Sequence, residues 1–163
     1  MTSEQATGDE AGLPEGCALH FHHFDEFDAA ALYDVLKLRF DVFILEQESL
    51  YPELDGADRR ALHAVVTDGR GAPVGTARVL NLDKDDAPLV IGRVAIRADH
   101  RGGGLGGALL RLVLDRLDGI APGRVIRLGA QKHLEAFYAR FGFRRISDVY
   151  DDGGIPHVDM ERT

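Results

Sequence analysis

Apolar and polar side chains alternate along several short stretches of the chain, with the two-residue period of half-buried β-strands. Turn residues rich in glycine and aspartate, at 68–71 and 151–154, separate two pairs of stretches, and each pair is predicted to form an antiparallel hairpin. The strands predicted from alternation or from runs of β-branched residues cover residues 19–24, 61–67, 73–80, 89–96, 125–128, 143–150 and 155–161.

Apolar residues that recur every three or four positions predict three helical regions between these strands. The first, residues 27–47, is one helix or two linked helices. The second begins at Leu105 and is stopped by Pro122, and the third, residues 134–141, is stopped by Gly142. The predicted order is therefore strand, helix, three strands, helix, strand, helix and two strands, without internal repeats or a transmembrane run.

The length and composition of the chain favour one domain. The chain has 163 residues, of which 45% are hydrophobic, which is enough for one hydrophobic core but too few for two. Residues 1–15 include four acids and no apolar stretch, which argues against a signal peptide or membrane anchor and predicts a disordered acidic tail. Residues 16–163 would then form the single folded domain.

Cysteine and histidine usage bears on compartment and metal binding. The single cysteine, Cys17, leaves no intramolecular disulfide and fits a reducing compartment, so a cytoplasmic protein is expected. Among seven histidines, His20 and His22 would share one face of a strand. A zinc site would need further ligands, and the chain has neither a cysteine pair nor a His-Glu-x-x-His motif. No metal is therefore expected.

Charge is distributed unevenly along the chain, whose formal net charge is −8. Residues 1–58 hold 14 acids and 2 bases, whereas residues 59–163 hold 13 acids and 17 bases. An acidic first half argues against nucleic acid as a partner and suits a cationic acceptor, although a solvated acidic surface has the same composition. Five arginines surround a glycine-rich run near the middle of the chain, namely Arg93, Arg97, Arg101, Arg111 and Arg116.

The glycine-rich run lies between a predicted strand and a predicted helix and has the chemistry of an anion site. Glycine lacks a Cβ and tolerates positive φ, so successive backbone N–H groups can turn toward one ligand. The helix N-terminus adds unpaired donors and partial positive charge. A phosphate-bearing ligand is therefore predicted here. The run comprises Arg101, Gly102, Gly103, Gly104, Leu105, Gly106 and Gly107.

Two common phosphate-binding motifs fit this run poorly. Gly102, Gly104 and Gly107 match the dinucleotide fingerprint Gly-x-Gly-x-x-Gly, but residues 97–101 separate them from the preceding strand. The next strand also leads into Gly129 rather than into the acidic residue that the fingerprint requires. A kinase-type phosphate loop would need a Gly-Lys-Ser/Thr sequence, which does not follow.

Two motifs about thirty residues apart carry a family resemblance. Arg101, Gly104 and Gly106 match Arg/Gln-x-x-Gly-x-Gly/Ala, and a Phe-Tyr-x-x-x-Gly-Phe motif begins at Phe137 and Tyr138. Over residues 17–161 the chain resembles the GCN5-related N-acetyltransferase (GNAT) family, and more narrowly its ElaA-type branch. The narrower likeness lies in Leu38, Arg39, Val42, Phe43, Glu46, Gln47, Asp55, Gly56 and residues 92–94 and 154–157. The resemblance implies an α/β (α+β) fold, with a single mixed, mostly antiparallel sheet flanked by helices.

The same resemblance implies where an acyl donor binds. It puts the pyrophosphate of coenzyme A on the backbone of residues 101–107, the ligand type that the glycine chemistry indicates by itself. The pantetheine arm would pair like an extra strand with Val94, Ala95 and Ile96. The N–H of Val94 or Ala95 would lie near the thioester oxygen. The side chains of this strand can pack the core at the same time.

The resemblance makes Tyr138 the candidate general acid for the departing thiolate, although a tyrosine at this helical spacing is otherwise typical of an interior aromatic. An acceptor amine with a pKa near 10.4 must also lose a proton. Many relatives carry an acidic residue on the central strand, where this chain has Arg93, so a water relay or a loop residue is favoured as base. The candidates are Glu46, Asp55, His63 and His157, of which Glu46 and His157 are singled out as catalytic.

The sequence therefore predicts an N-acetyltransferase that moves an acetyl group from acetyl-CoA directly to a primary amine, with a small molecule as acceptor. No nucleic-acid or membrane partner is expected, and the chain is expected to be a monomer or a homodimer. Two alternatives stay open. One is a non-catalytic acyl-CoA sensor with the same glycine run. The other is an acetyltransferase of protein N-termini or lysines, which would need an open peptide groove.

Overall fold

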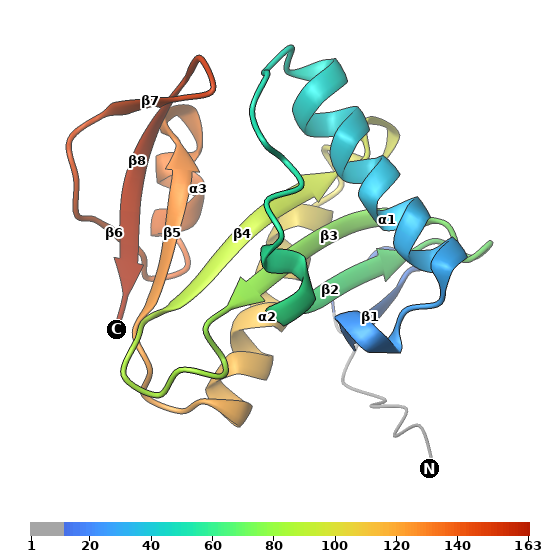
Figure 1. The fold of residues 1–163 in the computed structure, drawn as a ribbon, viewed down its shortest axis with the longest axis horizontal. Coiled ribbons are helices and arrows are strands. Elements are labelled where there is room, and N and C mark those ends of the chain that lie inside the picture. Colours follow the sequence, from blue (N-terminus) through green and yellow to red (C-terminus); the bar gives the residue numbers. More distant parts are fainter. Residues whose placement is uncertain (1–11) are drawn as a thin grey trace.

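The computed structural model describes residues 12–163, which form one mixed sheet with helices on both faces (Figure 1). The strands are β1 (Ala18–His23), β2 (Leu62–Thr67), β3 (Pro73–Leu80), β4 (Leu89–Ile96), β5 (Ile126–Gln131), β6 (Arg144–Arg145), β7 (Tyr150–Asp152) and β8 (Ile155–Arg162). Their order is β1-β2-β3-β4-β5-β8-β6, and β7 pairs with β8 beside this path. Among these strands only β4 and β5 pair in parallel. The predicted fold class is thereby confirmed.

Two long helices cover opposite faces of the sheet. α1 (Ala29–Phe40) crosses the face that is in front in Figure 1, and α2 (Leu105–Ile120) lies behind the sheet. Asp28 caps α1, because its carboxylate accepts the N–H of Ala31 at 2.7 Å. The other helical segments are a π-helix (Asp41–Glu46), α3 (Glu135–Ala139) and the 3₁₀ turns Phe24–Glu26, Ala57–Arg60, Ala98–His100 and Lys132–Leu134.

The helical region predicted over residues 27–47 is divided in two. α1 ends at Phe40 and continues directly as the π-helix, in which the N–H of Gln47 donates to the carbonyl of Val42, five residues earlier, at 3.3 Å. Segments of this kind are frequent at functional sites. The π-helix carries Val42 and Phe43 against the sheet near Ala95.

Each face of the sheet has its own apolar cluster. The larger lies under α2, whose apolar face, which includes Leu105, Leu109, Val113 and Leu117, is buried against the central strands. Each fully buried leucine contributes about 1.5–3 kcal/mol, so this face supplies most of the apolar stabilisation. The smaller cluster lies under α1 and the π-helix and consists of Leu38, Val42, Phe43 and Ala95, with Tyr51 packed against it.

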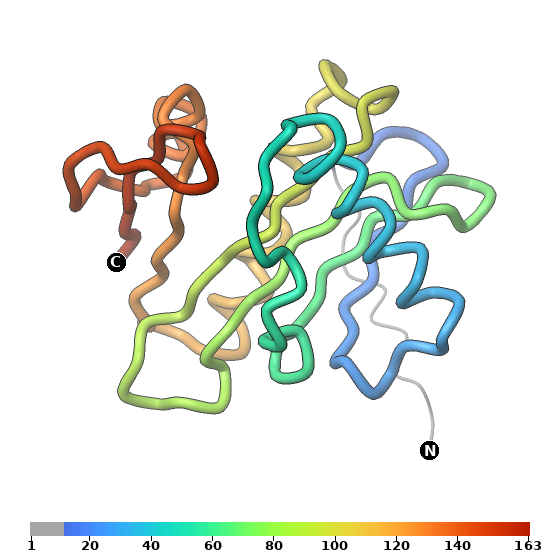
Figure 2. Tube along the Cα trace, turned by 45° about the horizontal axis from the view of Figure 1, so that its top comes forward, coloured from blue at the N-terminus to red at the C-terminus, as the bar shows by residue number. Residues whose placement is uncertain are grey.

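β4 and β5 are paired over only two residue pairs, Leu89 with Ile126 and Val90 with Arg127. Beyond Val90 the two strands diverge, and Figures 1 and 2 show β5, β8 and α3 standing apart from the other strands. The edge of β4 toward β5 therefore has no strand partner over residues 91–96. An extended ligand can pair with such an edge.

A β-bulge interrupts β4 in the same region. Gly92 pairs with Arg78 and Ala95 with Thr76, so three steps along β4 match two along β3. Arg93 accommodates the extra residue with a left-handed φ of 52°, which is uncommon for a residue with a side chain. Bulges of this kind re-aim side chains beside active sites.

The strand predicted over residues 143–150 differs from the structure, which has two short strands there, β6 and β7. The N–H of Ile146 donates to the Asp159 carbonyl at 2.9 Å, but the N–H of Asp159 donates to the Ser147 hydroxyl at 2.8 Å. A side chain thus replaces the main-chain partner, and regular pairing resumes at Tyr150.

The predicted acidic tail covers residues 1–15, of which residues 1–11 lie outside the described part of the chain. Residues 12–15 lie in a turn whose Leu13 packs against the larger core cluster. The Pro14 carbonyl accepts the N–H of Cys17 at 3.0 Å, which connects this turn to β1. From residue 12 onward, the chain contains no helix long and apolar enough to span a membrane.

Candidate active site

Two cavities open along the gap between β4 and β5. The larger has a volume of about 610 Å³ and lies beside the N-terminus of α2. We call it the donor cavity, after the acyl donor that the sequence predicts there. All the predicted donor-binding residues line it except Gly103, namely Val94, Ala95, Ile96, Arg101, Gly102, Gly104, Leu105, Gly106 and Gly107.

Unpaired backbone donors lie at the N-terminus of α2. Gly104 precedes the helix with a left-handed φ of 84°, and no side chain caps the helix there. The first helical hydrogen bond runs from the N–H of Ala108 to the Gly104 carbonyl at 3.0 Å. The N–H groups of residues 105–107 therefore have no helical partner, and together with the helix dipole they favour a phosphate in the donor cavity.

Arg101 makes an ion pair at the donor cavity. Its Nε donates to the Ile96 carbonyl at 2.9 Å, and its two terminal nitrogens donate to the two carboxylate oxygens of Glu46. Hydrogen bonding from Arg101 lowers the pKa of Glu46 below its usual value. Glu46 thus lies on the donor side, as a carboxylate whose proton affinity is reduced.

The smaller cavity has a volume of about 260 Å³ and lies between the β4 bulge, the loop after the π-helix and the β7–β8 turn. We call it the acceptor cavity. The hydroxyl of Ser49, a residue that lines this cavity, donates to the Gly153 carbonyl, and a Cβ at Gly153 would come within 2.4 Å of Ser49 Oγ. Its polar side chains are Gln47, Ser49, Tyr51, Arg78, Arg93, Gln131, Tyr138, Asp152 and His157.

The two cavities share five lining residues, which are Gln47, Val94, Gln131, Leu134 and Tyr138. At this junction Gln131, the last residue of β5, donates to the side-chain oxygen of Gln47 at 3.1 Å. The amide pair bridges the gap from β5 to the end of the π-helix. The junction is therefore where a group could pass from one cavity to the other.

Tyr138 is the ionisable residue at that junction. Its side chain is 7% exposed and packs edge to face against Phe137 and Phe143, with ring centroids 5.1 Å and 6.2 Å away. Its hydroxyl makes no hydrogen bond with any described residue and is not fully buried, so it faces the cavities. Burial raises the pKa of Tyr138 to about 12, which keeps the phenol protonated at neutral pH.

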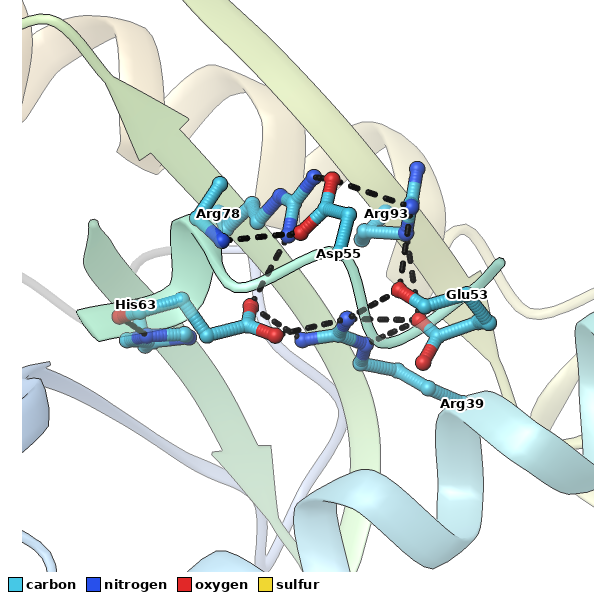
Figure 3. Close-up of polar contacts among 8 residues, drawn as sticks. Arg39, Glu53, Asp55, His63, Arg78 and Arg93 are labelled. Atoms are coloured by element: carbon cyan, nitrogen blue, oxygen red, sulfur yellow. Dashed lines mark hydrogen bonds and ion pairs between the residues drawn. The ribbon is translucent and has the colours of Figure 1, made fainter. Parts of the chain in front are cut away.

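A cluster of buried charges lies beneath the acceptor cavity (Figure 3). Arg39 of α1 is 1% exposed and donates to Glu53 at 2.6 Å and to Asp58 at 2.7 Å. Arg78 of β3 donates to Asp58 at 3.0 Å and, through two nitrogens, to Asp55 at 2.9 Å and 2.6 Å. These bonds connect α1, the loop after the π-helix and the sheet.

Arg93 completes this cluster from the β4 bulge. Its Nε donates to the Glu53 carboxylate at 3.1 Å, and its Nη2 donates to the Glu53 carbonyl at 3.0 Å and to Asp55 at 3.4 Å. Three guanidinium groups thus face three carboxylates, and their charges cancel. The acids of this cluster therefore do not form the acidic wall that a cationic acceptor would favour.

The electrostatics of the cluster follow from burial and pairing. Burial opposes ionisation of Asp58, but hydrogen bonds from Arg39 and Arg78 outweigh it and lower the pKa of Asp58. Hydrogen bonds from Arg78 likewise hold the pKa of Asp55 well below its usual range. All three arginines therefore keep ionised partners at neutral pH.

Sequence reasoning missed this cluster, although one signal was available. Arg39 and Arg78 stand at apolar positions of a helix and a strand, and a buried charge requires a partner. The partners could not be paired from sequence, because Glu53 and Asp58 come from a loop that folds back over the sheet.

The four base candidates lie in different surroundings. Asp55 and His63 line neither cavity, and His63 is buried, with its Nε2 2.9 Å from the Asp58 carbonyl and its pKa lowered by burial. His157 lines the acceptor cavity, and its Nδ1 lies 2.7 Å from the Ile155 carbonyl. A carbonyl only accepts, so Nδ1 carries the proton, and in the neutral ring Nε2 keeps a lone pair.

Metal ligation finds no support from geometry in the part of the chain that is described. There, no three His, Cys, Asp or Glu side chains come together as potential metal ligands. His20 and His22 of β1 do lie near one another, with ring centroids 6.1 Å apart. His22 also packs against Phe27, with ring centroids 4.7 Å apart and the rings tilted by 38°.

An extended thioester fits the geometry of the two cavities. The free edge of β4 can pair with the amide groups of its arm, the N-terminus of α2 can hold its phosphates, and the second cavity can admit an acceptor. This is the arrangement that an acyl-CoA-dependent N-acyltransferase requires.

Comparison with known proteins identifies the family. Residues 28–163 match the family described as acetyltransferase (GNAT) domain, and the chain belongs to this family. It is 37% identical to protein ElaA of Escherichia coli over 141 residues, which cover 86% of this chain and 92% of ElaA. The predicted membership of the GNAT family, with its likeness to ElaA, is confirmed.

Solved structures agree with this assignment. The crystal structure of E. coli ElaA matches with a TM-score of 0.85 and 35% identity, over 90% of this chain and 99% of ElaA. An acyl-CoA N-acyltransferase from Pseudomonas aeruginosa matches with the same TM-score, the same coverage and 32% identity. A GNAT family acetyltransferase from Elizabethkingia anophelis, solved with acetyl-CoA bound, shares the fold with a TM-score of 0.65 at 13% identity, over 91% and 99% of the two chains.

Proposed function

We propose that the protein is an N-acetyltransferase that moves the acetyl group of acetyl-CoA directly to the primary amine of a small molecule. The observation that carries this proposal is the free hydroxyl of Tyr138 at the junction of the donor and acceptor cavities. The acceptor cavity has a volume of about 260 Å³, which favours a small acceptor over a peptide.

The groups proposed to bind acetyl-CoA belong mostly to the backbone. The N–H groups at the start of α2 would bind the pyrophosphate, and the free edge of β4 would pair with the pantetheine arm. The N–H of Val94 or Ala95 would then stabilise the oxyanion that forms at the thioester. Arg101 would act by positioning the loop, since Glu46 and the Ile96 carbonyl occupy its donors.

Tyr138 is assigned the proton transfer to the leaving group. When the amine attacks the thioester carbon, the carbon–sulfur bond breaks and a thiolate with a pKa near 8.5 departs. A phenol that stays protonated at neutral pH can donate a hydrogen bond to the sulfur as the carbon–sulfur bond breaks. Full transfer of its proton to a thiolate of lower pKa is uphill and requires that solvent return a proton to Tyr138, so the hydrogen bond carries most of the effect. The residue is already buried in an aromatic setting, so little reorganisation is needed.

His157 is assigned the proton transfer from the acceptor. His157 lines the acceptor cavity and keeps a lone pair on Nε2 in its neutral ring, whereas the carboxylate of Glu46 is held by Arg101 on the donor side. We therefore favour His157, acting directly or through water, over Glu46 as the base. The expected cytoplasmic location and the monomeric or homodimeric state stay predictions.

A thiol-release screen tests the function. Purified protein with acetyl-CoA is offered amino acids, polyamines, amino sugars and short peptides, and free coenzyme A is measured with a thiol reagent. Release with small amines, and the acetylated amine found by mass spectrometry, is the expected result. Binding of acetyl-CoA without release for any amine would contradict the proposal and favour an acyl-CoA sensor.

The base assignment is tested by pH. We expect His157→Gln to lower kcat/KM for the amine about 100-fold at pH 7. The deficit should shrink toward pH 10, because an amine with a pKa near 10.4 then arrives increasingly neutral. His20→Gln, at an exposed histidine of β1 that lines neither cavity, is the matched control. A deficit that does not change with pH would exclude His157 as base, and the same profile in Glu46→Gln would assign the role to Glu46.

A further inference from the structure

The walls of the acceptor cavity offer hydrogen-bond donors that the reaction itself does not use. Arg93 is the clearest case, because its Nε and Nη2 are both engaged by the loop after the π-helix. Its third nitrogen, Nη1, makes no hydrogen bond with any described residue, although the side chain lines the cavity and is 19% exposed. An arginine held in this way can bind an anion without first losing side-chain freedom.

The backbone conformation of Arg93 adds a cost that calls for an explanation. Its φ of 52° belongs to the left-handed region, where a side chain is disfavoured by about 1–2 kcal/mol. Strained residues of this kind cluster at ligand-binding positions. The bulge directs Arg93 to the border between the buried charge cluster and the acceptor cavity, as Figure 3 shows for its contacts with Glu53 and Asp55.

Tyr51 supplies a second donor on the same wall. Its ring centroid lies 5.3 Å from the guanidinium carbon of Arg93, and its hydroxyl has no hydrogen-bond partner among the described residues. Burial raises the pKa of Tyr51, so the hydroxyl is protonated at neutral pH. Arg93 can thus donate one N–H and Tyr51 one O–H, and a carboxylate has two oxygens that can accept them.

The balance of charges around the acceptor cavity favours a ligand with a singly charged anionic group over one with a phosphate. Arg39, Arg78 and Arg93 are already balanced by three carboxylates, so the wall offers donors without a large excess of positive charge. The only carboxylate that lines the acceptor cavity in the described chain is Asp152, on β7 across the β4–β5 gap from Arg93. Its charge also raises the pKa of Tyr51, so this carboxylate lies near the Tyr51 hydroxyl and can pair with the positive charge of an amine in the same cavity.

We propose that the acceptor is a small amine that also carries a carboxylate, as an amino acid does, and that Arg93 and Tyr51 bind this carboxylate. The inference rests on the proposed N-acetyltransferase function and names its substrate class. The amino group would then extend from the Arg93 wall toward Tyr138 and His157, which line the same cavity. Arg93 occupies the strand position where many relatives have an acid, and in this chain it acts in substrate binding.

Matched substrate pairs test the proposal directly. kcat/KM is measured for leucine against isoamylamine and for phenylalanine against phenethylamine, with the methyl esters as controls that keep the amine and remove the charge. A charge-assisted hydrogen bond predicts that each amino acid is preferred over its decarboxylated partner and its ester about 10- to 100-fold. Preference for the decarboxylated amines would overturn the substrate class and leave the N-acetyltransferase function standing. Absence of thiol release with every amine would overturn both.

Two variants separate recognition from structure. Arg93→Lys keeps the charge that faces Glu53, but its ammonium ends short of the Nη1 position, so the preference ratio should fall at least tenfold through KM of the amino acid. Tyr51→Phe removes one hydroxyl and should lower the ratio about 3- to 10-fold. A purely structural role would lower kcat/KM equally for both members of a pair and leave the ratio unchanged, which would contradict the proposal.

Discussion

The donor and acceptor cavities are built from different materials. The groups assigned to bind the ligand in the donor cavity belong to the main chain, namely the unpaired N–H groups at the start of α2 and the free edge of β4, although the side chains of Arg101 and Glu46 also line it. The acceptor cavity is made of side chains from the π-helix, its following loop, β3, β4, β5 and the β7–β8 turn, resting on buried ion pairs. A site built from backbone groups is disturbed by changes in backbone conformation. A site built from side chains that rest on buried ion pairs is disturbed when a charge loses its partner. The two cavities should therefore respond to different substitutions.

The largest effect is expected where the cavities meet. Tyr138→Phe removes only the hydroxyl and keeps the aromatic packing, so it should lower kcat about 10²- to 10⁴-fold. The dissociation constant of coenzyme A, measured by calorimetry, should change little, because the donor is held by backbone. Tyr33→Phe, at an exposed tyrosine of α1, is the matched control. An unchanged kcat across pH 6–9 would remove Tyr138 from the mechanism.

The second-largest effect is expected from a substitution that disturbs the acceptor cavity but not the donor cavity. Arg39→Met leaves Glu53 and Asp58 buried without their shared partner, which should lower the free energy of unfolding by about 3–5 kcal/mol. In the fraction that stays folded, KM for the acceptor should rise more than the dissociation constant of coenzyme A. Lys37→Met removes an exposed ion pair of the same helix and should barely move the urea midpoint. Equal weakening of both ligands by Arg39→Met would show that the cavities are not energetically separate.

The same contrast explains what the sequence could predict. The glycine run and the apolar face of α2 are each made of residues a few positions apart in the sequence. Both could therefore be recognised along the chain. The β4 bulge and the charge cluster could not, because they need a left-handed Arg93 and carboxylates that lie tens of residues from their arginines. Tyr138 was found only through the family motif, since its spacing alone indicates a core aromatic.

A smaller effect tests the donor side by conformation. Gly104 has a φ of 84° and Gly103 has no positive φ, while a Cβ at either position would meet no atom within 4 Å. Gly104→Ala should therefore lower the free energy of unfolding by about 1–2 kcal/mol and weaken coenzyme A binding. Gly103→Ala should leave the stability nearly unchanged. Equal losses of stability in the two variants would indicate that space, rather than φ, governs this loop.

The smallest expected effect is the loss of stability in acid, which should depend on the charge cluster beneath the acceptor cavity and not on the glycine run of the donor cavity. His63, whose pKa is lowered by burial, binds protons more readily when unfolded, so stability should begin to fall below about pH 6.5. Asp55 and Asp58, whose pKa values are lowered in the folded state, stabilise the protein above the ordinary aspartate pKa near 3.9. Their contribution is lost as the pH falls from there through the folded values, and the urea midpoint should therefore drop more steeply below pH 4.

Asp55→Asn isolates the carboxylate part of this response. The variant should be less stable at pH 5, where it lacks the ion pair with Arg78, and should lose less stability between pH 5 and pH 3 than the original protein. Asp148→Asn, at an exposed carboxylate without an ion pair among the described residues, should leave the profile unchanged. Gly104→Ala should shift the whole profile down without altering its shape, because the substitution changes backbone conformation and adds or removes no charge. A flattened profile in Gly104→Ala would mean that the charge cluster and the glycine loop are coupled.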